Sequence, residues 1–449
     1  MQTAARKLAA SRSYRVVMQP TVLAWATRKN DMKILFLTST LPRFPKDLQA
    51  PFVIEQAKAW KQRRPEDEIV ILAPHDAASA RKETVDGVDI QRFQYFAPAR
   101  FQAVAYPAIL PNIRRNPLIL GQLPFFLWSE YATARRIVKA RNIDLVYAHW
   151  VMPQGVVARW IRKTTGVPYF VQNHSSDLAV FGKLGAAGRA VARSVLRDAH
   201  GFFCVNERQK QEALDFFPFE ERRDIANRTT VLPMGVGMDV EQVGSSVTPV
   251  AAGGFAQDIG MISRLSRKKG VDLFIAAVER LAEDGLFFPV AIAGDGEDRQ
   301  ALSALPRTAN IRFVGVLAGT EKLNFFDGCR FMAFPSVATG GDVEGMPVAV
   351  LEALCCGKLI VAGRDTNIAM LPEWPEIQGA VELLDNPRDI DAFAAALRRL
   401  LALEPDAIYA RVERLRGVMA RYRWNRLIDE YLARIDQDGL AAARCGRGP

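Results

Sequence analysis

Two glutamates with seven residues between them, Glu344 and Glu352, flank the start of an apolar segment of this 449-residue chain. The run VAVLEALCC, which contains Glu352, consists of good helix formers and predicts a helix. The N-terminus of a helix offers free N–H groups and partial positive charge, which suits a phosphorylated ligand. A carboxylate in an apolar helix is costly to bury without a partner. The two glutamates are therefore either exposed side chains on a half-buried helix or ligand-binding groups.

The segment around these glutamates is predicted to form a strand, a loop, a helix and another strand. FMAF (331–334) and LIVA (359–362) are short apolar runs that are typical of buried parallel strands. The loop between them contains Gly345, and glycine allows the backbone to approach a ligand closely. Pro347 is predicted at the first helical position, and Gly357 is predicted to end the helix.

The run PS…EGMPVAVLEALCCGKLIVA resembles the Glu-x7-Glu signature of family 4 retaining glycosyltransferases, which have the GT-B fold. The resemblance implies that Glu344 contacts the transferred sugar and that Glu352 holds the ribose hydroxyls of the donor. It also places Gly345, Met346 and Pro347 among the substrate-binding residues.

Histidines follow two predicted strands in the first half of the chain. His149 lies at the end of the strand predicted over 144–148, where a histidine is either structural or directed at a ligand. The stretch PYFVQNHSSDL resembles the H-G-x-D segment of the same family, with His174 and Asp177 in register and Ser175 in place of the glycine. The resemblance implies that His174 lies over the donor sugar near the reacting carbon and that Asp177 binds substrate.

Basic and glycine residues follow two predicted strands in the second half. ISRLSRKKG resembles the family segment G-R-L-x-x-K-G, which implies that Arg264 and Lys269 neutralise the donor pyrophosphate; Ser263 replaces the glycine. Fixed cations there would stabilise the charge that develops on the leaving diphosphate. A solvated basic turn is the alternative interpretation. Gly315 matches the family position whose backbone contacts the nucleotide base.

The sequence departs from the family pattern in three further places. The loop after the first predicted strand, TSTLPRFPKDLQAPFV, lacks a Gly-Gly pair, so we assign it no phosphate-binding role. GRDTNIAMLPE replaces a second Gly-Gly loop, and Lys358 stands where proline is frequent. The changes in GRDTNIAMLPE and at Lys358 leave the distal donor contacts undefined.

Composition indicates a globular protein, with 49% hydrophobic residues and a formal charge of +10. No apolar run reaches the roughly 18 residues that span a bilayer. Five cysteines without C-x-x-C spacing, together with the lack of a secretory signal, indicate a cytoplasmic protein.

Residues 1–31 contain six basic residues and one acidic residue, a net charge of +5. They could pass for a transit peptide, but Met32 before KILFLTS favours a disordered leader or an upstream start.

Strand-like runs alternate with helical stretches in two series, which predicts right-handed βαβ units and parallel sheets. The expected fold class is α/β, with two doubly wound Rossmann-like domains facing a central cleft, as in GT-B. Ligands of such sheets bind at the carboxyl ends of the strands, so the cleft is the expected site. The predicted strands cover 34–37, 69–73, 144–148, 169–172 and 202–205 in the first series, and 258–262, 289–293, 311–315, 331–334 and 359–362 in the second.

The domain organisation follows from a turn-rich stretch of small residues between the two series. The predicted parts are a basic leader (1–31), an N-terminal acceptor-side domain (32–240), a linker (241–254), a C-terminal nucleotide-sugar-binding domain (255–412), a helix that crosses back to the first domain (413–437) and a tail (438–449).

We expect a retaining, metal-independent glycosyltransferase that moves a hexose from a UDP- or GDP-sugar to a hydroxyl of a saccharide or lipid-linked acceptor in envelope or exopolysaccharide synthesis. The nucleotide sugar is a substrate, and no cofactor is expected. One alternative is a sugar-nucleotide epimerase of the same fold, which would need carboxylate bases. Another is a basic protein that binds nucleic acid or membrane, although no nucleic-acid motif is present. The D-x-D triplet at 389–391 suggests a GT-A enzyme, but it is better explained as a helix N-terminus.

The segment 96–128 is too long and too apolar for an ordinary connection between strand and helix. A basic pair beside aromatic rings is typical of an interfacial membrane contact, which would hold a cytoplasmic protein at the inner face of a membrane near a lipid-linked acceptor. The alternative is an irregular helix pair packed on the domain's own core. The charged and aromatic residues concerned are Arg114, Arg115, Phe125, Phe126 and Trp128.

Overall fold

The computed structural model describes residues 31–437, except for 45, 46, 48, 175, 176, 238–255, 306 and 340–342. The side chains of residues 177, 179 and 180 are also left out of the description. Nearly all of the predicted leader, and the whole of the predicted linker and tail, therefore lie outside the described residues. The chain from Met32 onward forms one compact unit.

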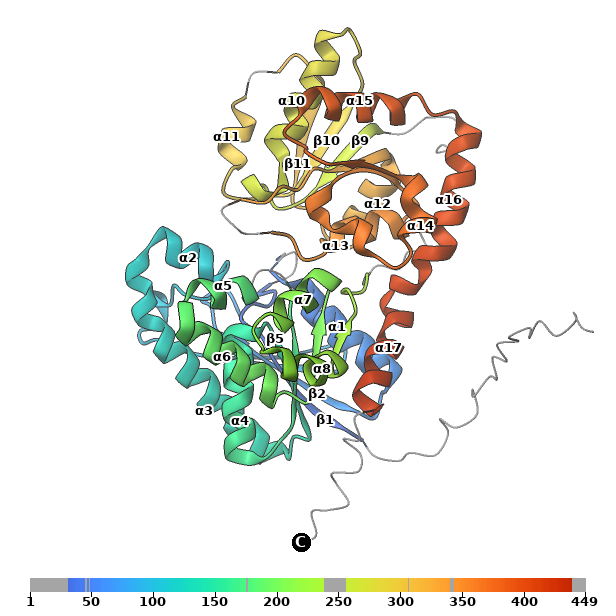
Figure 1. Cartoon of the computed structure of the whole chain (residues 1–449). Helices are drawn as coiled ribbons and strands as arrows, with labels where there is room; N and C mark the ends of the chain where they lie inside the picture. Colours follow the sequence, from blue (N-terminus) through green and yellow to red (C-terminus); the bar gives the residue numbers. More distant parts are fainter. Residues whose placement is uncertain are drawn as a thin grey trace, which may run out of the picture. The chain divides into compact units, whose positions relative to one another are not determined.

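The first half contains an eight-stranded sheet in the order β3-β4-β2-β1-β5-β6-β7-β8. Figure 1 labels β1, β2 and β5 of this sheet. Its strands are parallel except that β3 pairs antiparallel with β4. The central strands are buried along nearly their whole length, as expected for a parallel sheet covered on both faces. The strands are β1 (Lys33–Leu37), β2 (Glu68–Pro74), β3 (Lys82–Val85), β4 (Val88–Phe93), β5 (Leu145–His149), β6 (Tyr169–Gln172), β7 (Gly201–Cys204) and β8 (Thr229–Val231).

Helices connect most of the parallel strands of this sheet and bury one apolar side each against it. A short π-helix, η3 (Val151–Gly155), stands between β5 and the helix that follows it. The helices are α1 (Pro51–Arg63), α2 (Ile109–Arg115), α3 (Leu123–Arg141), α4 (Val156–Thr165), α5 (Asp177–Lys183), α6 (Gly185–Asp198), α7 (Glu207–Leu214) and α8 (Phe219–Arg228), with η1 (Ala99–Phe101) and η2 (Pro117–Gln122) before α3.

The second half contains a six-stranded parallel sheet in the order β11-β10-β9-β12-β13-β14. Its strands are β9 (Gln257–Ile262), β10 (Val290–Ala293), β11 (Ile311–Gly315), β12 (Cys329–Phe334), β13 (Leu359–Gly363) and β14 (Val381–Leu384). The main helices are α10 (Val271–Glu283), α11 (Arg299–Ser303), α12 (Thr320–Gly328), α13 (Val348–Cys355), α14 (Trp374–Ile377), α15 (Ile390–Leu401), α16 (Pro405–Met419) and α17 (Trp424–Gln437), with the 3-10 turns η4 (Arg267–Lys269) and η8 (Ala420–Tyr422).

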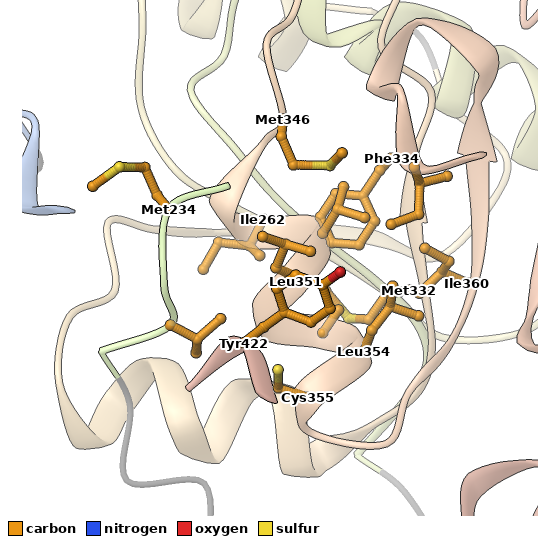
Figure 2. Packing of buried hydrophobic residues seen from close by; sticks show 14 of the residues in the cluster. Met234, Ile262, Met332, Phe334, Met346, Leu351, Leu354, Cys355, Ile360 and Tyr422 are labelled. Carbon is orange, nitrogen blue, oxygen red and sulfur yellow. The ribbon is translucent and has the colours of Figure 1, made fainter. Parts of the chain in front are cut away.

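Helix α13, which carries Glu352, is buried almost all round. An apolar helix with this little exposed surface is held by packing rather than by its own short length. Its apolar side chains lie among residues of the neighbouring strands, and Cys355 lies near Tyr422 of η8 (Figure 2). The labelled members of this cluster include Leu351 and Leu354 of the helix with Ile262, Met332, Phe334 and Ile360 of the strands.

The expected fold class is confirmed, because both sheets are parallel α/β sheets of the predicted kind. Each of the ten predicted strands is present to within two residues at its ends. Four strands were not anticipated, namely β3, β4, β8 and β14, three of which are polar or only three to four residues long. The D-x-D triplet is a helix N-terminus as predicted, because the Asp389 side chain caps α15 by accepting a bond from the Ala392 N–H (3.0 Å).

One local prediction about α13 is wrong by a residue. Pro347 is not the first helical residue but the N-cap, with extended backbone angles of φ −63° and ψ 120°. The helix begins at Val348. An N-cap has non-helical angles that proline's fixed φ also allows, so the missing N–H is harmless at either position.

Helix α17 packs on α1 of the first half, where Arg64 and Asp436 form an ion pair with Nη2 and Oδ2 2.5 Å apart. Beneath this contact runs a buried chain of hydrogen bonds. Gln172 Nε2 on β6 donates to the hydroxyl oxygen of Tyr431 on α17 (3.0 Å), and the Tyr431 O–H lies 3.1 Å from the carbonyl oxygens of Leu232 and Pro233. The C-terminal helix therefore satisfies polar groups inside the first half.

We predict that Tyr431→Phe lowers the free energy of unfolding by about 1–3 kcal/mol, the usual cost of a buried polar group left without its partner. Gln172 Nε2 would lose its acceptor, and the two carbonyls would lose their donor. Urea denaturation followed by tryptophan fluorescence measures the change. The same replacement at the exposed Tyr409 on α16 is the control and should leave the midpoint unchanged. Equal midpoints for the Tyr431 variant and the wild type would contradict the prediction.

Candidate active site

Glu344 is a buried, ionised carboxylate at the carboxyl end of β12. Its Oε1 lies 2.7 Å from Lys269 Nζ and 3.7 Å from Lys268 Nζ, both on the turn η4. Burial alone would raise the pKa of this carboxyl group, but the two lysines outweigh burial and hold the pKa below its ordinary value. The interpretation of Glu344 as an exposed side chain is wrong.

The backbone at Glu344 and Gly345 is held by side chains from both halves of the chain. Arg208 Nη2 on α7 and Asn367 Nδ2 each donate to the Glu344 carbonyl oxygen at 2.7 Å. Asn206 Nδ2 donates to the Gly345 carbonyl oxygen, also at 2.7 Å. The same Asn206 caps α7 through its Oδ1, which accepts from the Gln209 N–H (2.9 Å). These three donors fix the loop that presents the Glu344 carboxylate.

Gly345 is required here because of a close approach between the two halves. A Cβ atom at this position would lie 2.1 Å from the carbonyl oxygen of His174 and 3.0 Å from the Val205 side chain. A clash with a backbone oxygen cannot be relieved by a side-chain rotation. The structure therefore brings His174 and Glu344, which are 170 positions apart in the sequence, to neighbouring positions.

His149 and His174 form a stacked pair at the carboxyl ends of β5 and β6. Their rings are 5.1 Å apart and nearly parallel, and His149 Nδ1 lies 2.9 Å from His174 Nε2. Phe52 of α1 and Trp150 pack on His174 with ring centroids at 4.7 and 4.9 Å. Burial lowers the pKa of His174 to about 3 and also lowers the pKa of His149 strongly. Repulsion between the two rings if both were protonated lowers the pKa of His149 further. Both imidazoles are therefore neutral at physiological pH.

Two neutral imidazoles that share one hydrogen bond leave one N–H and one lone pair over, whichever ring donates. Those remaining nitrogens are His149 Nε2 and His174 Nδ1, and both are buried without a hydrogen-bond partner among the described residues. Unpaired buried polar atoms call for an explanation. A ligand with hydroxyl groups, which both donate and accept, would satisfy them.

Glu352 is also buried, so its interpretation as an exposed residue is wrong too. Its Oε1 lies 2.5 Å from Lys322 Nζ on α12, whereas Oε2 has no hydrogen-bond partner among the described residues. Glu55 of α1 comes close to the same group. Burial and the negative charge of Glu352 raise the pKa of Glu55 to about 7, and Lys322 and Lys58 oppose that rise. The unpaired Oε2 is the atom that a ligand hydroxyl could bind.

Arg264 follows β9 and Gly315 is the last residue of β11, and the carboxyl ends of these strands lie at the same edge of the second sheet as Glu344. Arg264 is partly exposed, and its Nε pairs with Glu297 Oε2 at 3.0 Å. Gly315 has a positive φ of 81°, and its carbonyl oxygen accepts from the Gly294 N–H (2.7 Å). Nothing lies within 4 Å of a Cβ built on Gly315, so its surroundings are open.

The remaining predicted site residues fall into two groups. Met346 buries its side chain in the apolar cluster around α13 (Figure 2), which leaves its backbone for ligand contacts, and Pro347 has no N–H to donate. Asp177 is the first residue of α5, but its side chain lies outside the described atoms. Within the described ranges, no group of three or more His, Cys, Asp or Glu side chains could hold a metal ion.

Sequence reasoning missed several residues of this site. No local pattern indicated that they face it, since each acts through a contact with a distant part of the chain. Asn206 is visible in the sequence only as a helix cap before Glu207. The missed residues are Phe52, Glu55, Trp150, Asn206, Arg208, Lys322 and Asn367.

Comparisons with known proteins agree with this architecture. Residues 49–228 match the family model of a glycosyl transferase 4-like domain, and residues 256–403 match that of glycosyl transferases group 1. The crystal structure of Anabaena Alr3699/HepE in complex with UDP and glucose superposes with a TM-score of 0.61 at 16% identity, covering 90% of this chain and 99% of that one. The α,α-trehalose 6-phosphate synthase from Burkholderia multivorans superposes with a TM-score of 0.65 at 16% identity, covering 93% and 99%. The fold is therefore GT-B.

The curated relatives identify the chemistry. The putative teichuronic acid biosynthesis glycosyltransferase TuaC of Bacillus subtilis is 23% identical over 82% of this chain and 89% of its own length. The uncharacterized glycosyltransferase MJ1178 of Methanocaldococcus jannaschii is 23% identical over 59% and 70%. With one glycosyltransferase model matched in each half, the chain is a glycosyltransferase of the GT-B class. This finding favours the transferase over the epimerase and the non-enzymatic alternatives.

We predict that the two neutral histidines make the folded protein less stable as the pH is lowered from 7 towards 4. Below pH 6.5, about the ordinary pKa of histidine, the two imidazoles bind protons in the unfolded protein but stay neutral in the folded protein. Lowering the pH therefore favours the unfolded state. Glu55 and Glu130, whose pKa values are raised, act in the opposite direction, so the difference between variants is diagnostic.

Urea denaturation at pH 7, 6, 5 and 4 checks this dependence. His174→Gln should lose less stability on acidification than the wild type, because one of the groups that titrates on unfolding is gone. Phe52→Leu, which alters the packing on His174 without removing a titratable group, is the matched control and should keep the wild-type slope. An unchanged slope in His174→Gln would show that the imidazole is not held neutral.

Proposed function

We propose that this chain is a family 4 retaining, metal-independent glycosyltransferase that transfers a hexose from a UDP- or GDP-sugar to a hydroxyl of a saccharide or lipid-linked acceptor. The observation that carries the proposal is the Glu344 carboxylate, held ionised by Lys269 and Lys268, in a loop whose Gly345 approaches the backbone of His174 closely. His174 and its partner His149 each keep one imidazole nitrogen that has no hydrogen-bond partner among the described residues. Cations that suit a diphosphate and neutral polar groups that suit a sugar thus belong to segments that contact each other.

The names of relatives support the donor and the pathway. TuaC of Bacillus subtilis is a putative teichuronic acid biosynthesis enzyme, and AmsK of Erwinia amylovora, 29% identical over 33% of this chain, acts in amylovoran biosynthesis. The solved structure of HepE holds UDP and glucose. We infer a nucleotide-sugar donor and a saccharide acceptor in the synthesis of an envelope polysaccharide or exopolysaccharide.

The proposed donor site uses the charged edge of the second sheet. Lys269 and Arg264 would neutralise the diphosphate, and Arg264 is partly exposed and able to exchange its present partner, Glu297, for a phosphate oxygen. Glu352 Oε2 would accept a bond from a ribose hydroxyl, while Lys322 holds the other oxygen of this carboxylate. The open backbone at Gly315 would contact the base.

The proposed reaction is a front-face displacement. The acceptor hydroxyl attacks the anomeric carbon from the side on which the diphosphate leaves, so the configuration is retained. Negative charge grows on the departing diphosphate, and Arg264 and Lys269 stabilise it. Glu344 and the neutral His174 orient the sugar by hydrogen bonds. Since these fixed cations supply the charge neutralisation, we propose that no metal or cofactor is needed.

Some aromatic residues of segment 96–128 are buried in the core and others are exposed at the surface. Phe126 is fully buried and packs on Phe93 and Tyr95 at centroid distances of 5.1 and 5.2 Å, so its prediction as a membrane-facing ring is wrong. Its neighbour Phe125 and the nearby Trp128 are 56% and 65% exposed. Successive helical residues point about 100° apart, which separates adjacent rings between core and surface.

We propose that the exposed part of this segment contacts an anionic membrane, where a lipid-linked acceptor would be found. Five large apolar side chains are at least half exposed within 28 residues, and Arg114 and Arg115 end the helix α2 beside them. None of the described helices is long and apolar enough to cross a membrane. The five exposed residues, which we call the apolar patch, are Phe101, Leu118, Leu120, Phe125 and Trp128.

Incubation with a panel of UDP- and GDP-sugars tests the reaction directly. Release of the nucleoside diphosphate identifies the donor, and NMR of the product identifies the configuration at the anomeric carbon. Turnover in EDTA would support metal independence. An inverted product would contradict retention, and the absence of turnover and of donor binding across the panel would contradict the proposed function.

We predict that Glu344→Gln abolishes transfer with the fold intact and that Glu352→Ala raises the donor KM.

We predict that replacing either Arg264 or Lys269 by Met costs about 2–4 kcal/mol of transition-state stabilisation, which is the scale of one lost oxyanion donor. Steady-state kinetics gives both quantities. Arg414→Met, which removes an exposed charge from α16, is the control. A loss below threefold in both cation variants would show that these residues are surface charges only.

We predict that protein lacking residues 1–31 floats with liposomes that contain anionic lipid and that binding is lost when Arg114, Arg115 and Trp128 are replaced by Ser. Phe219→Ser is the matched control, because Phe219 on α8 is 87% exposed but lies outside the apolar patch. No flotation of the leaderless protein would contradict the membrane contact. Flotation that all variants share would place the contact elsewhere on the surface.

A further inference from the structure

Glu130 is an acidic residue buried completely in the middle of α3. Isolated buried carboxylates are costly when ionised, and the two forces acting on this one are burial and a single side-chain hydrogen bond, to Gln154. Gln154 belongs to the π-helix η3 and is equally buried. Neither residue has a part in the mechanism described above.

The partners of Gln154 determine the orientation of its amide. The carbonyl oxygen of His149 can only accept, and the backbone N–H of Ser39 can only donate; each lies 3.2 Å from the amide. Gln154 Nε2 therefore donates to His149 and Oε1 accepts from Ser39. Oε1 is then the amide atom that faces Glu130, at 3.3 and 3.4 Å from its two carboxyl oxygens.

This arrangement requires a proton on Glu130. An ionised carboxylate has only acceptor oxygens and would repel the amide oxygen, whereas a carboxylic acid donates its O–H to that oxygen. The electrostatic environment agrees, because burial raises the pKa of Glu130 well above its ordinary value. Gln154 Oε1 then accepts two hydrogen bonds, from Glu130 and from Ser39, while Nε2 donates to His149.

The bond from Gln154 to His149 restrains a strained part of the backbone. Trp150 has φ 74° and ψ 137°, a region that non-glycine residues seldom occupy because it is strained. The carbonyl oxygen that Gln154 holds belongs to the peptide between His149 and Trp150. The N–H of the same peptide donates to the Gln172 carbonyl oxygen (2.7 Å), so both sides of this peptide are held.

We propose that Glu130 is a neutral carboxylic acid that acts through Gln154 as a positioning residue for the histidine pair. It ties the loop after β1, at Ser39, to the end of β5, at His149, and thereby sets where the imidazoles of His149 and His174 lie. The part of this inference that concerns catalysis rests on the proposed function, because it assigns the histidines to the transferred sugar.

Two replacements of Glu130 test whether this residue positions the histidines or only fills space in the core. Glu130→Gln keeps a neutral donor of the same size, and Glu130→Leu fills the space without any donor. A buried leucine should fold at least as well as a buried acid, since no ionisable group has to be desolvated. We expect the melting temperature of the Leu variant to equal or exceed that of the wild type.

Kinetics and NMR then report on the site itself. With the donor identified for the wild type, Glu130→Leu should lower kcat about 10- to 100-fold, the effect of a small displacement of positioned groups, with the donor KM unchanged. Glu130→Gln should restore kcat. The chain has four histidines, so ¹⁵N-histidine labelling resolves their side chains. The signals of His149 and His174 should move in the Leu variant and return in the Gln variant, with those of the other two unmoved.

The NMR readout does not depend on transfer activity. Imidazole signals that move in Glu130→Leu and return in Glu130→Gln support the positioning role even if no donor on the panel is turned over, in which case only the proposed function fails. Unchanged imidazole signals and unchanged kcat in Glu130→Leu would overturn the inference. A melting temperature that falls together with kcat in both variants would also overturn it, since Glu130 would then serve folding alone.

Discussion

The site depends on a buried negative charge that the surrounding backbone and two lysines keep in place. Removing Glu344 from water is costly, and the nearby ammonium groups of Lys269 and Lys268 compensate for it. The loop that carries it has carbonyl oxygens pointing into the protein, which Asn206, Arg208 and Asn367 satisfy. Asn206 and Arg208 lie at the N-terminal end of α7, and Asn367 lies in the second half. The position of the carboxylate therefore depends on contact between the two halves.

The two sides of the site differ in charge, with neutral polar groups on one side and ionised groups on the other. On the side of the first sheet, burial keeps His149, His174 and Glu130 neutral, so these groups offer directed hydrogen bonds without net charge. On the side of the second sheet, ionised groups predominate, with Glu344 paired to Lys269 and Glu352 paired to Lys322. A diphosphate suits the charged side and sugar hydroxyls suit the neutral side, which agrees with the polarity of a nucleotide sugar.

Much of the fold was predictable because parallel strands and the helices between them leave strong local signals. Buried strands are continuous apolar runs, and all ten that were predicted are present. The strands that were missed, such as KETV in β3 and TTV in β8, are short and polar and exist through pairing with a neighbour. The positions of Glu344 and Glu352 were also predictable, since their spacing around one helix is local.

The sequence by itself determined the elements, the two glutamates and the candidate histidines, because these depend on patterns within a few turns of chain. Only the tertiary structure decided their partners. Asn206 contacts Gly345 across 139 positions, and Glu130 contacts Gln154 across 24, and neither pairing leaves a local pattern. The adjacent rings of Phe125 and Phe126 make the same point, since an apolar run does not say which face of a helix meets the core. Packing places one ring in water and the other inside.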